Sequence, residues 1–415
     1  MNSSDMAKQK ASMFIGSRNR FLRLLASIFV VSTIFDSVYF PFIKENTNIS
    51  WLLGVIILVA YVVFYPKKVM HQGRERPWMI LFLVVIVLEE IYRYTTVNVS
   101  FYSLFRYTMP YIQVYILYLV LVDILKDPRS YIGMIKWIFI SFFVISIFNN
   151  INFSMITQVK SDRVGISTMN LNQLAFHYAA IVICTFTLFL RKSSLIKKYN
   201  KFIIVGTISM LYALIRTGSR SGAIALMVGI MASILINYNK VKMTKYMKMI
   251  PILIVILVYI VTSSNILITR IQATIEKGDT SSRQQIWEAG LVMYKMNPVI
   301  GYGGGYAHKL GLMLNRSNPI AAHNTYLQIL LSFGIIGMIF FMAMIGVILL
   351  DAWKRRGTIW GSMFFTVLLM AMVLGMGLHI GYNKLFWVLL ALTVDIDVMI
   401  AYESRLSSNL NYLKE

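Results

Sequence analysis

The sequence predicts an all-α, polytopic integral membrane protein. Of its 415 residues, 58% are hydrophobic and 14% are charged, and the mean hydropathy is +0.67. A soluble domain of this length could not bury so much apolar surface, whereas a bilayer solvates it. Several apolar runs also reach the roughly 20 residues that a helix needs to cross the hydrocarbon core. We therefore expect residues 1–415 to form a single polytopic membrane domain.

About twelve apolar runs are candidates for transmembrane helices. They are residues 21–43, 51–65, 78–95, 101–125, 131–149, 173–190, 202–215, 221–238, 249–264, 323–350, 359–378 and 382–402. The second and seventh runs are short for a span. Met1–Arg20 is polar and precedes a run of span length, which predicts a first transmembrane helix and not a cleaved signal peptide.

The distribution of basic residues predicts the orientation. The net charge is +23. With the N-terminus inside, the cytoplasmic loops and tails hold about 24 Lys and Arg residues and the opposite side holds about 11, as the positive-inside rule requires. Both termini are thus expected in the cytoplasm. The basic charge is explained by orientation and by contact with anionic lipid, so nucleic-acid binding is not expected.

The largest predicted loop, residues 265–322, lies on the extracytoplasmic side. Ser282 and Gln285 fit a capping box, which predicts a helix over about 283–296. The glycine-rich stretch GYGGGYAHKLG follows, and it lacks the Gly-Lys-Ser/Thr ending of a phosphate-binding P-loop. We expect this stretch to form a tight turn or to allow a close backbone approach.

The segment LIRTGSRSGAIAL connects two predicted spans on the outer side. Gly218 suits the end of the first helix, and Ser219 can cap the start of the second. The first N–H groups of that helix, together with Arg220, would form a site for an anion such as phosphate. Arg216 has two interpretations, which are an anion ligand and a cation that complements the dipole at a helix C-terminus or reaches the interface.

Charged residues inside spans are costly and often mark function. Most of those in this sequence fall in the predicted outer halves of their helices: Asp36, Glu89, Glu90, Arg93, Arg106, His177, His379 and Lys384. Glu89 and Arg93 are four residues apart, so they can form an ion pair along one helix face. A polar cavity is therefore expected on the outer side.

Further arginines lie in the predicted outer loops: Arg163, Arg270, Arg283 and Arg316. A single loop arginine is usually solvated, but several on one side favour an anion site. No metal or other cofactor is expected. The sequence has no HExxH or His/Cys cluster, its lone Cys184 lies in a span, and the acidic residues of the predicted outer loops do not form a DxD pattern. A cationic outer site without a metal suits a substrate that already carries a lipid-linked pyrophosphate, since arginine stabilises that leaving group.

His323 and Asn324 lie where the outer loop meets the apolar run HNTYLQILLSFGIIG. A lone histidine at such a boundary often forms a hydrogen bond at a helix start. In an arginine-rich setting it is also a candidate general base, because imidazole titrates near neutral pH. Both interpretations remain open from the residues alone.

Three segments in order resemble the O-antigen ligase/polymerase family of bacterial polysaccharide assembly. They are SRSG (219–222), RQQIWEAGLVMYKMNPVIGYGGG (283–305) and HNTYLQILLSFGIIG (323–337). The resemblance covers roughly 215–340, with a looser match around Arg163. It implies a membrane glycosyltransferase of the GT-C type that uses an undecaprenyl-pyrophosphate-linked glycan without a metal, at the outer face of the bacterial cytoplasmic membrane.

The resemblance also implies roles for individual residues. Arg220 and Arg283 would bind the donor pyrophosphate, and His323 would deprotonate or orient the acceptor hydroxyl. The other candidates, placed by a looser match or by position, are Arg163, Arg216, Arg270 and the supporting Asn324.

Three functions are compatible with these observations. We favour a polymerase that joins a growing glycan to a lipid-linked repeat unit in capsule, exopolysaccharide or O-antigen synthesis, and the family also implies a chain-length regulator as partner. One alternative is an O-antigen ligase that transfers the glycan to lipid A-core. The other is a lipid-linked oligosaccharide flippase or transporter, although such proteins usually show paired halves and a site at the membrane midplane.

Overall fold

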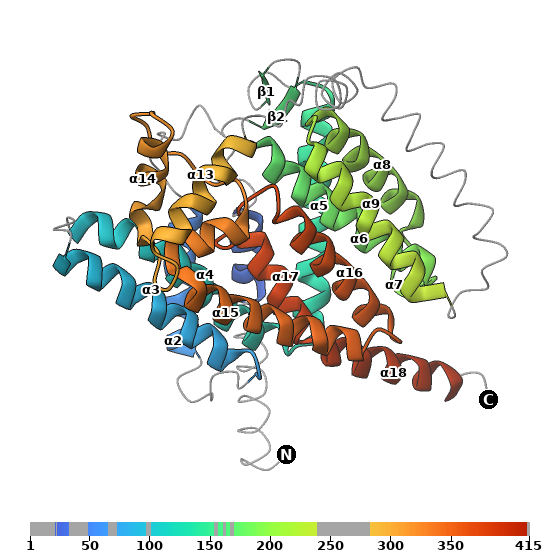
Figure 1. The fold of residues 1–415 in the computed structure, drawn as a ribbon. Helices are drawn as coiled ribbons and strands as arrows, with labels where there is room; N and C mark the ends of the chain where they lie inside the picture. The colour runs from blue at the N-terminus through green and yellow to red at the C-terminus, as the bar shows by residue number, and fades with distance from the viewer. Residues whose placement is uncertain are drawn as a thin grey trace, which may run out of the picture.

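The computed structural model describes residues 21, 23–32, 49–64, 73–96, 101–152, 157–160, 163–166, 170–238 and 283–412. These residues form a helical bundle with one antiparallel hairpin (Figure 1). The elements are α2 (Ile49–Phe64), α3 (Arg76–Thr96), α4 (Phe101–Leu125), α5 (Pro128–Asn150), β1 (Thr157–Lys160), β2 (Arg163–Ile166), α6 (Leu171–Leu190), α7 (Ser194–Lys197), α8 (Asn200–Arg216), α9 (Arg220–Asn237), α13 (Arg283–Met296), η2 (Gly303–Gly305), α14 (Tyr306–Met313), α15 (Thr325–Lys354), α16 (Ile359–Leu374), α17 (Lys384–Val394) and α18 (Ile396–Tyr412).

The helical fold confirms the predicted class, with the small β1–β2 hairpin as an addition that the sequence did not predict. Within the described residues, five helices are long and apolar enough to cross a membrane, or up to six if the bent pair α17–α18 is counted as one span. The total of about twelve stays a prediction, because the run 249–264 lies outside the described residues. Residues 265–282 of the predicted large loop, with Arg270, also lie outside them.

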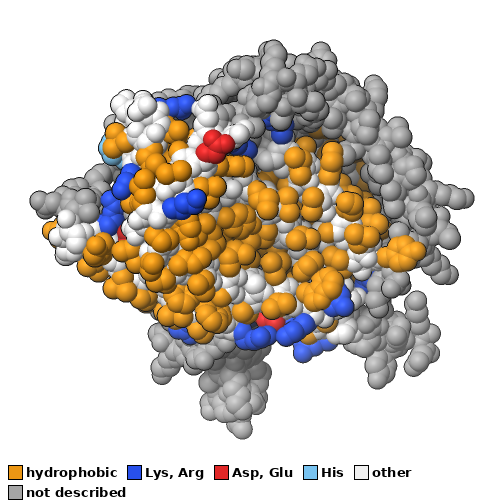
Figure 2. Space-filling view, viewed as in Figure 1, with side chains coloured by type: hydrophobic (Ala, Val, Ile, Leu, Met, Phe, Trp, Pro, Cys, Tyr) orange, Lys and Arg blue, Asp and Glu red, His pale blue; other side chains and the backbone are white. Residues whose placement is uncertain are grey.

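Apolar side chains lie on both the inside and the outside of the bundle. Helix α6 is central, with Phe176 and Tyr178 fully buried. On the outside, Val62, Ile208 and Leu235 expose 60%, 60% and 67% of their surface. Figure 2 shows a wide band of hydrophobic side chains across one face, with Lys and Arg side chains along its lower margin. An apolar exterior of this kind requires lipid as solvent.

Helix α15 bends at Gly334, where the backbone is not helical (φ +61°, ψ −164°). A Cβ at Gly334 would lie 2.0 Å from the Val299 carbonyl oxygen, so the chain can pass this closely only at a glycine. Gly301, with φ +79°, is likewise in contact with the backbone of Ser332. The segment 297–302 thus inserts at the bend of α15.

This insertion also satisfies backbone groups that the bend releases. The Ile335 N–H donates to the Pro298 carbonyl at 2.8 Å, and the Tyr302 N–H donates to the Leu331 carbonyl at 2.7 Å. Irregular backbone within a membrane bundle is tolerated where the protein itself supplies the missing partners. NPVIGYGGG and SFGIIG, which belong to two of the segments that carry the family resemblance, therefore interlock in space.

The two ends of α15 define two ends of the bundle. Asn324 caps its start, and Arg355 follows its last residue. In Figure 1, α13, α14 and the hairpin lie toward the first end, here called the His323 end, and α18 lies toward the second, the Arg355 end.

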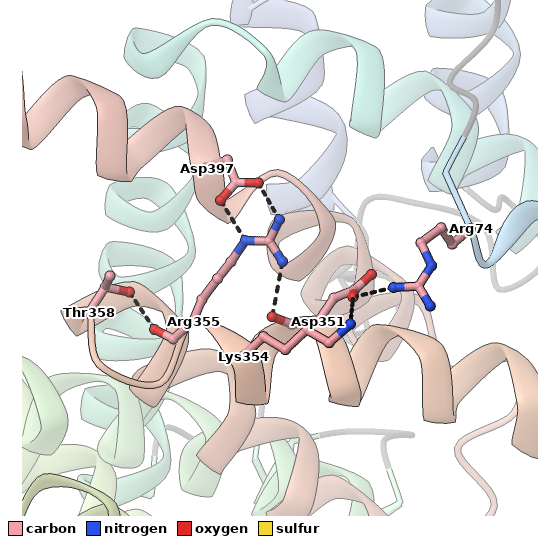
Figure 3. Close-up of polar contacts among 6 residues, drawn as sticks. All are labelled: Arg74, Asp351, Lys354, Arg355, Thr358 and Asp397. Carbon is pink, nitrogen blue, oxygen red and sulfur yellow. Dashed lines mark hydrogen bonds and ion pairs between the residues drawn. The ribbon is translucent and has the colours of Figure 1, made fainter.

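At the Arg355 end, ion pairs join helices that are distant in sequence (Figure 3). Arg74, just before α3, contacts Asp351 of α15 at 2.9 Å, and Lys354 lies 3.9 Å from the same carboxylate. Arg355 forms a two-pronged pair with Asp397 of α18. These contacts fix the starts of α3 and α18 against the end of α15.

Candidate functional site

The turn between α8 and α9 has the geometry that its sequence predicts. Gly218 adopts a positive φ of +59° just after α8. The Ser219 side chain accepts a hydrogen bond from the Gly222 N–H at 3.2 Å and so caps α9, and it donates to Asn172 Oδ1 of α6 at 2.8 Å. Arg220 is the first residue of α9 and is partly exposed. A guanidinium at a helix N-terminus is a suitable element of an anion site.

Arg216 donates from Nη1 to the carbonyl oxygens of Asn149 and Asn150, at 2.8 and 2.6 Å, and from Nη2 to Asn152 Oδ1. It therefore binds the C-terminal end of α5, where unpaired carbonyls attract a cation. Arg163 donates from Nε to the Thr217 carbonyl at 2.7 Å, at the end of α8. These contacts favour the structural interpretation of Arg216, and they fix the hairpin over the turn.

Arg283 begins α13 and reaches the start of α9. A Cβ placed on Gly377, in the connection after α16, would lie 3.1 Å from Arg283 Nη1 and 2.9 Å from Ser221 Cβ. Since both atoms lie near one point, they are no more than about 6 Å apart. The guanidinium of Arg283 is thus close to the residue that follows Arg220.

His323 is half-buried and has a left-handed backbone (φ +51°), which is uncommon outside glycine. Asn324 then caps α15, because its Oδ1 accepts the N–H groups of Tyr326 and Leu327 at 2.9 and 3.1 Å. Trp287 of α13 donates from Nε1 to the carbonyl of Ala322 at 3.0 Å. The residues on either side of His323 are therefore held by two helices.

Burial, and then the positive charge of Arg283, lower the pKa of His323 from its usual value near 6.5. Both causes disfavour the imidazolium. The neutral ring that results at pH 7 is the form that can accept a proton. The guanidinium of Arg283 thus lies beside Ser221 of the SRSG turn, and its charge acts on the imidazole of His323.

The candidates that the structure brings together are therefore Arg283, His323 and the turn that carries Arg220. Arg163 and Arg216 lie at the same turn but bind helix ends. Asn324 has a capping contact. Arg270 cannot be placed, because it lies outside the described residues.

The glycine-rich stretch packs closely against α3. The Gly304 N–H donates to a carboxylate oxygen of Glu90, and a Cβ at Gly305 would lie 2.2 Å from Arg93 Nη2. The close backbone approach predicted for this stretch is thus present. Glu89 and Arg93 both belong to the described residues, and they do not form the ion pair that their spacing allows. Glu90 and Arg93 instead contact the turn, which a pattern of spacing along one helix cannot reveal.

Sequence reasoning missed Thr325 and Gly377. The Thr325 hydroxyl donates to the Leu378 carbonyl at 2.6 Å and accepts from the Ile380 N–H at 3.0 Å. The Thr325 N–H donates to the Gly375 carbonyl at 2.7 Å. The one available signal was the pair of glycines in GMG, near the end of the apolar run 359–378.

No group of three or more His, Cys, Asp or Glu side chains that could hold a metal occurs among the residues that the structure describes. The cations near His323 are the chemically distinctive groups of this end. They suit a phosphate-bearing ligand.

Comparisons with known proteins gave a match to one family model. No curated protein matched the chain. Residues 205–342 match the family model described as O-antigen ligase, and this range contains Arg220, Arg283, His323 and both halves of the interlock at Gly334. The match confirms the resemblance to the O-antigen ligase/polymerase family that the three sequence segments predicted.

Proposed function

We propose that this protein is a membrane glycosyltransferase that polymerises lipid-linked repeat units. It transfers an undecaprenyl-pyrophosphate-linked glycan chain onto the next lipid-linked repeat at the outer face of the cytoplasmic membrane. The observation that carries the proposal is the position of Arg283, which lies beside Ser221 of the SRSG turn and acts electrostatically on His323. The proposal combines an anion site at Arg283 with a proton acceptor at His323.

Arg220 and Arg283 bind the donor diphosphate in this proposal. Each is the first residue of a helix, and the unpaired N–H groups of such a first turn can contribute to binding an anion. When the bond between the sugar C1 and the diphosphate oxygen breaks, negative charge grows on the leaving group. Guanidinium groups stabilise that charge in place of a metal ion. Arg270 stays a further predicted ligand.

His323 acts as the general base. Its neutral imidazole accepts the proton of an acceptor sugar hydroxyl, whose oxygen then attacks C1 of the donor sugar. One glycosidic bond forms, the C1–O bond to the diphosphate breaks, and undecaprenyl diphosphate leaves. The lowered pKa keeps the ring unprotonated near neutral pH.

The experiment uses purified protein in liposomes with synthetic undecaprenyl-pyrophosphate repeat units and a metal chelator. A ladder of elongated glycans on a gel supports a metal-independent polymerase. Movement of the lipid between leaflets without a new glycosidic bond overturns it and favours the flippase alternative.

The same assay separates polymerase from ligase. Lipid A-core and the lipid-linked repeat are offered together as acceptors. Transfer to lipid A-core alone identifies a ligase, whereas the polymerase elongates the lipid-linked repeat. Adding a candidate chain-length regulator tests that partner, because a narrower ladder is expected if it acts on this protein.

A further inference from the structure

The connection between α16 and α17 lies outside residues 205–342, yet it contacts the candidate site. Gly377 of this connection is buried, and the space that a Cβ would fill is taken by Arg283 Nη1 and the Ser221 side chain. These two groups come from α13 and α9. Gly377 is thus the point at which both helix starts meet a third element.

The glycine is needed for space and not for backbone conformation. Gly377 does not have a positive φ, unlike Gly218, Gly301, Gly303 and Gly334. Its N–H donates to the Leu374 carbonyl at 2.8 Å, so the local turn is already satisfied by the backbone. A residue with a side chain could adopt this backbone conformation, so a substitution at Gly377 would act on the neighbouring Arg283 and Ser221 side chains.

The connection is also fixed relative to His323. Thr325, two residues after His323, binds the backbone of Gly375, Leu378 and Ile380, on both sides of Gly377. Thr325 is 1% exposed, so these bonds form in a water-poor environment where a lost partner is costly. The position of Gly377 is therefore determined by the segment that carries His323.

We propose that Gly377 is a positioning residue of the diphosphate site, which sets the Arg283 guanidinium against the SRSG turn while Thr325 keeps this arrangement in register with His323. The inference rests on the proposed function, because it concerns the same diphosphate site. It extends that site to a segment beyond the matched family region.

A double-mutant cycle tests the proposal with Gly377→Ala, Arg283→Ala and the combined variant. The readouts are kcat/KM for the lipid-linked donor and the affinity for farnesyl diphosphate as a short probe. A methyl group at Gly377 would lie 2.9 Å from Ser221 Cβ and 3.1 Å from Arg283 Nη1, so it separates the guanidinium from the SRSG turn. We expect Gly377→Ala alone to weaken both readouts by about 10- to 100-fold. In the Arg283→Ala background only the contact with Ser221 remains, so Gly377→Ala should change both readouts by a smaller factor than in the wild-type protein.

Two controls separate positioning from folding. Gly346→Ala in α15 adds a methyl group that would meet nothing within 4 Å, and it should leave both readouts unchanged. Thr325→Val removes the hydroxyl and should weaken farnesyl diphosphate binding, whereas Thr325→Ser should restore most of the affinity. The two Thr325 variants test whether its contacts with the connection between α16 and α17 support the site, even if Gly377→Ala does not fold.

The outcomes for this inference and for the proposed function are distinct. A protein that binds farnesyl diphosphate with the expected coupling but forms no glycosidic bond contradicts the transferase and supports the positioning role. If the protein elongates glycans but the losses caused by Gly377→Ala and Arg283→Ala simply multiply in the combined variant, only the positioning role is overturned. The same holds if Gly377→Ala behaves like the wild-type protein. Absence of coupling in both readouts also overturns it.

Discussion

The two ends of the bundle use arginine in different ways. At the Arg355 end, the guanidinium groups of Arg74 and Arg355 face the carboxylates of Asp351 and Asp397. At the His323 end, Arg216 donates to neutral carbonyl and amide oxygens. An ion pair cancels most of the field of its cation, whereas a guanidinium bound to neutral groups keeps its full charge. The first arrangement joins helices, and the second leaves positive potential for an anionic ligand.

The comparison predicts the largest loss for the proton acceptor. His323→Ala should reduce glycan transfer by about 10²- to 10⁴-fold, the usual contribution of a general base. Donor affinity should stay near that of the wild-type protein, since the imidazole does not bind the diphosphate in the proposed mechanism. Transfer rates and farnesyl diphosphate binding check this. An active His323→Ala variant would remove the base from the mechanism.

The next largest effect is expected for the diphosphate ligands. Arg220→Ala or Arg283→Ala should weaken donor binding by about 10- to 10²-fold, since a hydrogen bond to a charged group contributes about 1.5–3 kcal/mol. Isothermal titration with farnesyl diphosphate measures this. Arg356→Ala is the matched control, because Arg356 stacks on Trp353 at the opposite end. Equal losses in all three variants would contradict the difference between the ends.

The pH profile gives a smaller effect with a defined sign. Transfer requires neutral His323, so activity falls as pH drops through the pKa of that ring. Burial and the charge of Arg283 lower this pKa, which places the acidic limb below pH about 6.5. In Arg283→Ala the charge is gone, so the pKa should rise and the limb should move to higher pH. If the pH at which activity falls on the acidic side stays the same or decreases in Arg283→Ala, Arg283 does not act on His323.

The smallest effect is expected at the Arg355 end. The Arg355–Asp397 pair is partly exposed, with side-chain exposures of 32% and 61%. Solvent-exposed pairs contribute about 0.2–1 kcal/mol, so Arg355→Ala should lower thermal stability slightly and leave donor affinity unchanged. Thermal unfolding in detergent and probe binding measure both quantities. A loss of donor affinity would mean that the ion pairs at this end influence the site at a distance.

Several features followed from the sequence because their causes are local. Ser219 caps α9 through a bond to Gly222, three positions away, and Gly218 takes the positive φ that ends α8. The start of α13 at Arg283 agrees with the capping pattern. Hydropathy over short windows likewise predicted a polytopic helical membrane protein. These are properties of a few neighbouring residues and of their solvent.

The tertiary structure decided the features that depend on segments distant in sequence. Whether Arg216 binds a ligand or a helix end depends on α5, more than sixty residues away. The bend at Gly334 requires the segment 297–302, and the partners of Glu90 and Gly377 lie on other elements. Sequence spacing encodes neighbours along one helix, but contacts between helices depend on how the whole bundle packs. Composition and local capping therefore determined the helices and the membrane class, and packing alone decided that Arg283 meets Ser221 and Gly377 while Arg216 binds a helix end.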